Sequence, residues 1–264
     1  KYGQTRSLLS EVDIYNLFRK FQYIIPQGSV MSSLGNPYII ASLSNCIVLP
    51  EIYDSYGGVF YTDQQMAQLF KRRCGVGVDL STLRPAGMHV SNAAGTTSGA
   101  VSFMERFSNT TREVAQNGRR GALMITMDIA HPDIEQFITI KQDLTKVTGA
   151  NISVRLSDEF MNAAIEGLDW TTRAVNGGEV LETKKASHLL YKIAEGTWIC
   201  GDPGIQFDTA IQKWNTCKGS DIIRSSNPCS EYLFLNDTAC NLSSLNLMKF
   251  KDGAGKFDVE RLKA

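Results

Sequence analysis

Three side chains capable of chemistry alternate near the carboxyl end of the chain, at Asn227, Cys229 and Glu231. In an extended segment, side chains at positions i, i+2 and i+4 point to one face. Pro228 favours that conformation because its ring fixes its own φ and disfavours helical geometry at Asn227. We therefore predict that the three side chains converge on one small molecule. They would offer it a hydrogen-bonding amide, a sulfur for one-electron or nucleophilic chemistry, and a base.

A plainer interpretation treats Asn227-Pro228 as an ordinary turn and Cys229 as a small buried apolar residue, because free cysteine is among the most buried residue types. The cysteines do not form the tight pairs typical of a zinc site, so we predict no metal centre. Their sparse spacing also argues against a disulfide scaffold and favours a reducing compartment. The chain has six cysteines, at Cys46, Cys74, Cys200, Cys217, Cys229 and Cys240.

The composition is that of an ordinary globular protein. Of 264 residues, 43% are hydrophobic, and 27 basic residues balance 27 acidic ones, so no charge excess indicates nucleic acid or an anionic membrane as partner. No apolar run approaches the roughly 20 residues of a membrane-spanning helix. The residues from Lys1 to Gln4 do not resemble a secretory signal. We expect a cytoplasmic protein that binds neither nucleic acid nor membrane.

Helical and strand patterns alternate along the chain, which predicts an α/β fold with a parallel sheet and crossover helices. The apolar run Tyr38–Leu49, which contains Cys46, suits a strand buried on both faces. A capping-box pattern at Thr62–Gln65 predicts the start of a helix that continues to Arg73. Other strands are expected over residues 75–80, 123–129 and 151–156, and other helices over 8–22, 99–114, 131–141, 160–165 and 186–198. Periodicity alone does not specify a barrel.

Two segments contain glycines whose placement suggests close approach of backbone or ligand. Gly75 and Gly77 interrupt a predicted strand, where a missing side chain permits tight packing. Residues 116–122 form a loop rich in glycine and arginine that could grip phosphate, although a solvated turn explains the same composition.

The run NPCSEYLFLNDTACNLSSLNL at Asn227–Leu247 closely resembles the active-site segment of the ribonucleotide reductase catalytic subunit. Ser44–Val48 resembles the first barrel strand of that family, and Gly201–Asp208 resembles its adenosylcobalamin-dependent class II members. The resemblance implies part of a ten-stranded α/β barrel of two five-strand halves, with a central finger loop that carries Cys229. Residues 1–36 would be a helical lead-in, and residues 37–264 the first part of the barrel.

The resemblance covers nearly the whole chain but only about the first half of that barrel. A Ser/Thr-rich loop that cradles the substrate phosphates belongs to the second half, and no carboxy-terminal shuttle cysteines are present. We therefore interpret the chain as a fragment and expect it to be inactive alone.

Roles for individual residues follow from the resemblance. Cys229 would carry a thiyl radical that abstracts the 3′-hydrogen of a ribonucleotide, and Glu231 would take the 3′-hydroxyl proton. Asn227 would bind the ribose. The reducing equivalents would come from Cys46 and Cys240, which would end as a disulfide and should lie within about 7 Å of each other at their Cα atoms. Asn45 and Gly75 would lie against the substrate.

The resemblance also implies ligands and partners: a ribonucleoside diphosphate as substrate, adenosylcobalamin as cofactor, dNTP or ATP as allosteric effector, a thioredoxin-like reductant and a second copy of the chain. One alternative is a class I catalytic subunit served by a separate metal-containing radical subunit. Another is a non-catalytic nucleotide-binding module, although such a module would not need the three cysteines and Glu231. The expected effector-reading residues are Asp54, Arg84, Gln116 and Arg120.

Overall fold

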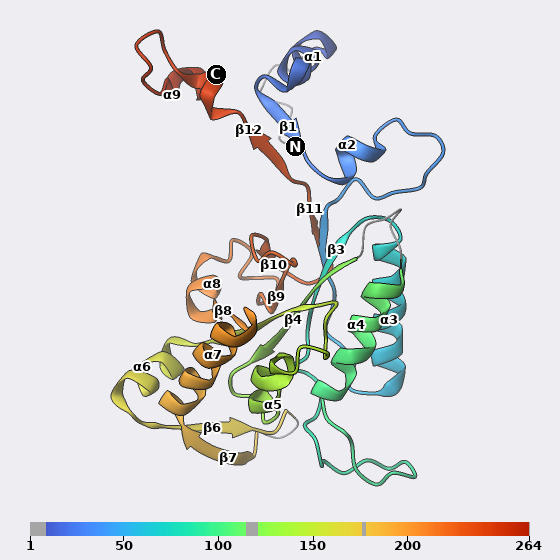
Figure 1. The fold of residues 1–264 in the computed structure, drawn as a ribbon, viewed down its shortest axis with the longest axis vertical. Coiled ribbons are helices and arrows are strands. Elements are labelled where there is room, and N and C mark those ends of the chain that lie inside the picture. Colours follow the sequence, from blue (N-terminus) through green and yellow to red (C-terminus); the bar gives the residue numbers. More distant parts are fainter. Residues whose placement is uncertain (1–8, 115–120, 176–177, 264) are drawn as a thin grey trace.

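The computed structural model describes residues 9–114, 121–175 and 178–263. Its centre is a six-stranded sheet in the order β11-β2-β3-β4-β5-β8 (Figure 1). Five of the strands run parallel, and β11 pairs antiparallel with β2 at one edge. The six strands are β2 (Cys46–Val48), β3 (Gly75–Asp79), β4 (Ala122–Asp128), β5 (Asn151–Leu156), β8 (Gly204–Phe207) and β11 (Thr238–Cys240).

Helices connect the parallel strands and cover one face of the sheet. Four phenylalanines, one from each of the first four such helices, are completely buried against the strands: Phe70, Phe107, Phe137 and Phe160. Because burial of such side chains is the main favourable term in folding, this apolar layer holds the helices to the sheet. The helices are α3 (Tyr56–Phe70), α4 (Met104–Glu113), α5 (Ile134–Thr139), α6 (Asp158–Glu166) and α7 (Ala186–Cys200), whereas α8 (Asp208–Trp214) follows the last parallel strand and contributes no buried residue.

The two faces of the sheet differ in chemistry because successive side chains of a strand point to opposite sides. Apolar side chains such as Val76, Ile125 and Val154 belong to the buried core beneath the helices. The side chains that alternate with these along each strand point to the opposite face, here called the inner face, and they are small or polar. It is formed by Cys46, Gly75, Gly77, Thr126, Asn151, Arg155 and Gln206, among others.

A short hairpin lies on the inner face. It consists of β9 (Ser225–Ser226) and β10 (Leu233–Phe234), which pair antiparallel and are joined by residues 227–232. A Cβ atom on Gly77 would lie 1.7 Å from the carbonyl oxygen of Ser226, so only glycine permits this approach. The glycines of β3 thus allow close approach of backbone, as the sequence predicts.

The remaining elements lie outside this sheet. Near the amino end, α1 (Glu11–Phe18) has a capping box between Ser10 and Asp13, and a 3-10 turn, η1 (Arg19–Phe21), follows it. β1 (Ile24–Pro26) pairs with β12 (Ser243–Leu245), so segments from the first and last parts of the sequence run side by side (Figure 1). The other elements are α2 (Ser29–Ser33), β6 (Asp169–Arg173), β7 (Val180–Lys185), α9 (Val259–Lys263) and the 3-10 turns η2 (Val101–Phe103), η3 (Ile140–Gln142) and η4 (Leu247–Phe250).

The α/β class and most of the predicted elements are confirmed, but two predictions are wrong. Only Cys46–Val48 of the expected strand over residues 38–49 is a strand, and Tyr38 is 92% exposed, so the run is not a buried strand. The predicted helix start at Thr62 lies in the middle of α3. The helix begins earlier because the Ser55 hydroxyl caps it by accepting from the backbone N–H of Gly58.

The sheet does not close into a barrel within the described residues, since β8 and β11 form its two edges. Its five parallel strands equal the number expected for one half of the barrel. None of the helices in the described segments is long and apolar enough to cross a membrane.

Candidate active site

A cavity of about 450 Å³ opens where the amino-terminal ends of β2 and β3 meet the turn of the hairpin. The side chains with chemistry come from segments far apart in the sequence, and the sheet brings them together. Five of the seven predicted catalytic and substrate-binding residues line this cavity: Asn45, Cys46, Gly75, Cys229 and Glu231.

Residues 227–232, here called the Cys229 turn, are not extended. The backbone N–H of Ser230 donates to the Asn227 carbonyl at 3.0 Å, which closes a tight turn, and Ser230 has a φ of 61°. The extended conformation predicted for this stretch is therefore wrong. Asn227 is fully buried, whereas Cys229 is exposed at the cavity. The turn thus separates the side chains that the alternating pattern would align, and presents Cys229 at its tip.

Asn227 joins the turn to the first strand of the sheet. Its side-chain amide donates to the Cys46 sulfur at 3.3 Å, and its side-chain oxygen accepts from the backbone N–H of Tyr232 at 3.0 Å. With both ends of the amide engaged and no exposed surface, Asn227 fixes the distance between the turn and β2. Asn227 therefore contacts Cys46 and does not line the cavity.

Cys46 and Cys240 are directly opposite each other on the antiparallel strands β2 and β11. Opposed residues in such a pair have Cα atoms about 4.5–5.5 Å apart, which falls within the range that a disulfide bridges. Both are free thiols here. Burial raises the pKa of Cys46 to about 12, although the Asn227 hydrogen bond lowers it, and burial also raises the pKa of Cys240. Both thiols are therefore protonated near neutral pH.

Glu231 follows the turn and contributes a carboxylate to the cavity wall. Its negative charge is one of the smaller causes that raise the pKa values of Cys46 and Cys240. A carboxylate that influences both thiols lies close to the cysteine pair. The cavity therefore combines a carboxylate, an exposed thiol and the Cys46 thiol, with Cys240 opposite Cys46 on the neighbouring strand.

Gly75 and Asn45 shape the cavity without contributing reactive groups. A Cβ on Gly75 would lie 3.0 Å from the Pro228 ring and 3.3 Å from the Cys46 sulfur, so any side chain there would crowd both. The Asn45 side chain accepts from the backbone N–H of Leu242 at 3.2 Å and so ties β2 to the segment after β11. Gln27, Gly28 and Ser29 also line the cavity, although nothing in their sequence indicated this.

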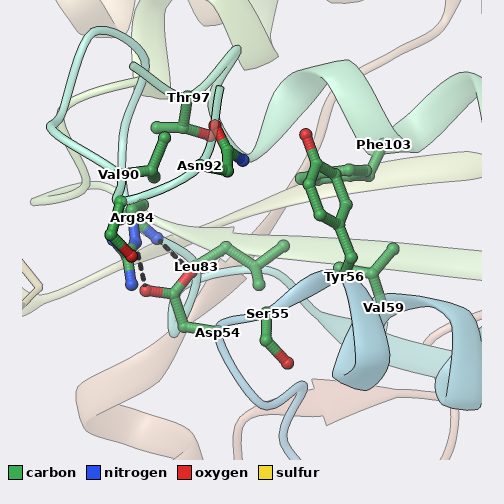
Figure 2. Close-up of a pocket in the computed structure, with 11 residues that line it drawn as sticks. Asp54, Ser55, Tyr56, Val59, Leu83, Arg84, Val90, Asn92, Thr97 and Phe103 are labelled. Atoms are coloured by element: carbon green, nitrogen blue, oxygen red, sulfur yellow. Dashed lines mark hydrogen bonds and ion pairs between the residues drawn. The ribbon is translucent and has the colours of Figure 1, made fainter. Parts of the chain in front are cut away.

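A second cavity of about 220 Å³ contains two of the predicted effector-reading residues. The Arg84 guanidinium donates to the Asp54 carboxylate at 2.6 Å, and the Arg84 backbone N–H donates to its other oxygen at 3.2 Å. Figure 2 shows this pair on one side of the cavity, with the Tyr56 and Phe103 rings on the other. Gln116 and Arg120, predicted to act with them, lie outside the described residues.

The loop over this second cavity is held at both ends by one buried carboxylate. Asp133 accepts from the backbone N–H of Ala86 at 3.0 Å and from that of Ala100 at 2.9 Å. The Arg84 guanidinium also donates to the His89 carbonyl at 3.1 Å. The loop between Ala86 and Ala100 is thus anchored to the start of α5, and its residues Val90, Asn92 and Thr97 face the cavity (Figure 2).

The fold and the site define an α/β protein whose open sheet carries a cysteine at the tip of a turn, near a pair of cysteines that are opposed on adjacent strands. The family model described as "Ribonucleotide reductase, barrel domain" matches residues 44–264. The chain belongs to the ribonucleotide reductase family.

Several relatives carry names that specify a cofactor. The chain is 39% identical to the vitamin B12-dependent ribonucleotide reductases of Rhodopirellula baltica and Streptomyces clavuligerus, over 87% and 83% of its length. It is 35% identical, over 93% of its length, to the vitamin B12-dependent ribonucleoside-diphosphate reductase of Mycobacterium tuberculosis. It spans 24%, 26% and 35% of the lengths of these three relatives.

Proposed function

We propose that the protein containing this chain reduces ribonucleoside diphosphates to 2′-deoxyribonucleotides by a radical mechanism. The observation that carries the proposal is one cavity lined by the exposed Cys229, the Glu231 carboxylate and Cys46, with Cys240 directly opposite Cys46 on β11. A binding module would need neither a reducible cysteine pair nor a thiol at the tip of a buried turn. The name of the Mycobacterium tuberculosis relative, a ribonucleoside-diphosphate reductase, supports the substrate class.

In this mechanism a thiyl radical on Cys229 abstracts the 3′-hydrogen of the ribose, which weakens the neighbouring bond between C2′ and its hydroxyl. Glu231 takes the 3′-hydroxyl proton as the 2′-hydroxyl leaves as water. Cys46 and Cys240 together supply two electrons and two protons, one proton for the water that leaves and one for C2′, and become a disulfide. Glu231 then returns its proton to the 3′-oxygen, and Cys229 returns its hydrogen atom to C3′. The raised pKa of Cys46 fits this role because the thiol keeps its proton until the leaving group needs it.

We propose adenosylcobalamin as the cofactor, as the names of the relatives suggest. When bound, it supplies a carbon-centred radical by homolysis of its cobalt–carbon bond. The described residues fit such chemistry, because Cys229, which would receive the radical, is exposed and lines an open cavity. Cys229 is accordingly the residue that would face the cofactor.

The cofactor proposal is tested by adding adenosylcobalamin to the purified protein that contains this chain, without any second protein subunit. We expect dNDP formation from NDP, with a dithiol as reductant, to depend on adenosylcobalamin and to saturate with it. Activity that requires a separate metal-containing subunit and ignores the cobalamin would instead support the class I alternative.

We also propose that the Asp54–Arg84 cavity reads a dNTP or ATP effector at a contact between two copies of the protein. The Arg84 guanidinium is 31% exposed and supplies a positive charge that suits a phosphate. Tyr56 and Phe60 remain 56% and 48% exposed beside it, as expected for residues that a second copy would cover.

We further propose that a thioredoxin-like protein in the cytoplasm reduces the disulfide between Cys46 and Cys240 after each turnover.

Arg84→Ala should weaken the effect of effectors on substrate choice while leaving catalysis itself intact. We expect the ratio of reduction rates for two competing substrates to respond to dNTPs about tenfold less than in the wild type, since one charged hydrogen bond contributes about 1.5–3 kcal/mol. Activity without effector should change less than about twofold. The matched control is Arg19→Ala, which removes an exposed arginine from η1. An unchanged response to every dNTP would contradict the assignment.

A further inference from the structure

The Cys229 turn is held by side chains from several strands of the inner face. Besides the Asn227 bond to Cys46, the Asn151 amide on β5 donates to the Pro228 carbonyl at 2.9 Å. On β8, the Gln206 amide donates to the Ser226 hydroxyl at 2.8 Å and to the Ser230 hydroxyl at 3.2 Å. The residues on either side of Cys229 are thus each bound by one amide of the sheet.

Gln206 is unusual for its place in the sheet. It is only 5% exposed, although it lies in the edge strand β8 between Ile205 and Phe207, which are 40% and 50% exposed. The alternation of a strand directs Gln206 to the inner face. A buried amide is unfavourable unless its polar atoms are bonded, and the two serines of the turn region supply that bonding.

The hydrogen bonds of Gln206 continue into the backbone of the turn. The Ser226 hydroxyl, which accepts from Gln206, donates to the Asn227 carbonyl at 2.9 Å. That carbonyl also accepts from the backbone N–H of Ser230, the bond that closes the turn. Ser230 has a positive φ, which is unfavourable for a side chain other than glycine and persists only where surrounding contacts enforce it. Gln206 bonds the hydroxyl of that same residue.

We propose that Gln206 and Asn151 are positioning residues for the Cys229 thiol. Asn151 fixes the peptide that precedes Cys229, and Gln206 fixes the serine that follows it, so the direction of the thiol is determined from both sides. This inference rests on the proposed radical function of Cys229. Neither amide touches the thiol or lines the cavity with it, so both act through the backbone of the turn.

The test uses the protein that contains this chain with Gln206→Met, which keeps the length of the side chain and removes its hydrogen bonds. We expect kcat to fall about 10- to 100-fold with KM within twofold, because a misplacement of the reacting group by about 1 Å can cost 100-fold. Gln136→Met is the matched control, since Gln136 is exposed on α5. That control should leave kcat unchanged.

A second measurement does not depend on turnover or cofactor. The rate of alkylation of Cys229 by iodoacetamide, followed by mass spectrometry of its peptide, should change at least threefold in Gln206→Met. The rate at Cys217, which lies in the loop after α8, should stay the same and serves as internal reference. Wild-type protein that forms no dNDP would refute the proposed function, yet these alkylation rates would still test the positioning.

Asn151→Ala keeps the proposal testable if Gln206→Met does not fold. Asn151 is exposed, so its truncation leaves no cavity in the core and should not lower the unfolding temperature. We expect kcat to fall several-fold with KM unchanged, less than for Gln206→Met because water can replace an exposed amide. The proposal is overturned if the variants that fold keep both kcat and the Cys229 alkylation rate within twofold of the wild type.

Discussion

Replacing Cys229 with serine is expected to reduce dNDP formation to background in the protein that contains this chain. Serine matches cysteine in shape and hydrogen bonding, but an O–H bond is stronger than an S–H bond, so an oxygen radical at this position is much harder to form. An increase of only about 4 kcal/mol in the barrier lowers the rate about a thousandfold. The measurement is dNDP formed per minute, together with NDP affinity by equilibrium binding.

NDP affinity should change less than about twofold in this variant, because Cys229 is exposed at the tip of its turn and its replacement leaves the cavity wall intact. Cys217→Ser is the matched control, since Cys217 lies outside the cavity and should be dispensable. Near-normal reduction by Cys229→Ser would rule out the radical role and return residues 227–230 to the status of a structural turn.

Cys240→Ser should produce a different defect. Hydrogen abstraction by Cys229 remains possible, but the pair of thiols on β2 and β11 is lost, so the radical intermediate cannot be reduced in the normal way. We expect dNDP to fall at least tenfold and free nucleobase to be released during incubation with substrate, measured by chromatography of the products.

The wild-type protein offers a direct check of the redox pair. In the wild type, a single turnover without external reductant should leave a disulfide between Cys46 and Cys240, detectable by mass spectrometry of the joined peptides. Their directly opposed positions in the sheet satisfy the distance that such a bond requires. Normal dNDP yield from Cys240→Ser, or a wild-type disulfide that joins other cysteines, would contradict the assignment.

Much of the secondary structure could be predicted from local sequence. β5 occupies the predicted residues 151–156, and Ser10 and Ser157 cap the helices that follow them. Such features are readable because the period of apolar residues and the reach of a capping side chain involve only a few neighbouring positions. The resemblance in Asn227–Leu247 predicted roles for Asn227, Cys229, Glu231 and Cys240 for the same reason, since these four residues lie within one short run.

Predictions failed where a stronger cap nearby or contacts from distant residues outweighed the local pattern. The pattern at Thr62 resembles a helix start, yet Asp63 instead forms an ion pair with Arg106 of α4 at 2.7 Å, inside a helix that begins at Tyr56. The alternation at residues 227–231 suggests an extended strand, but the bonds of the turn to Cys46 and Gln206 favour a tight turn.

The sequence by itself determined the α/β class and the family, and it predicted which side chains react. Only the tertiary structure decided which of these side chains meet. Cys46 and Cys240 are opposed because β11 returns antiparallel beside β2, and Cys229 reaches the cavity because Gly77 allows its hairpin to lie against β3. The support of the turn by Asn151 and Gln206 was not predicted at all, because sheet register joins residues that no local sequence pattern relates.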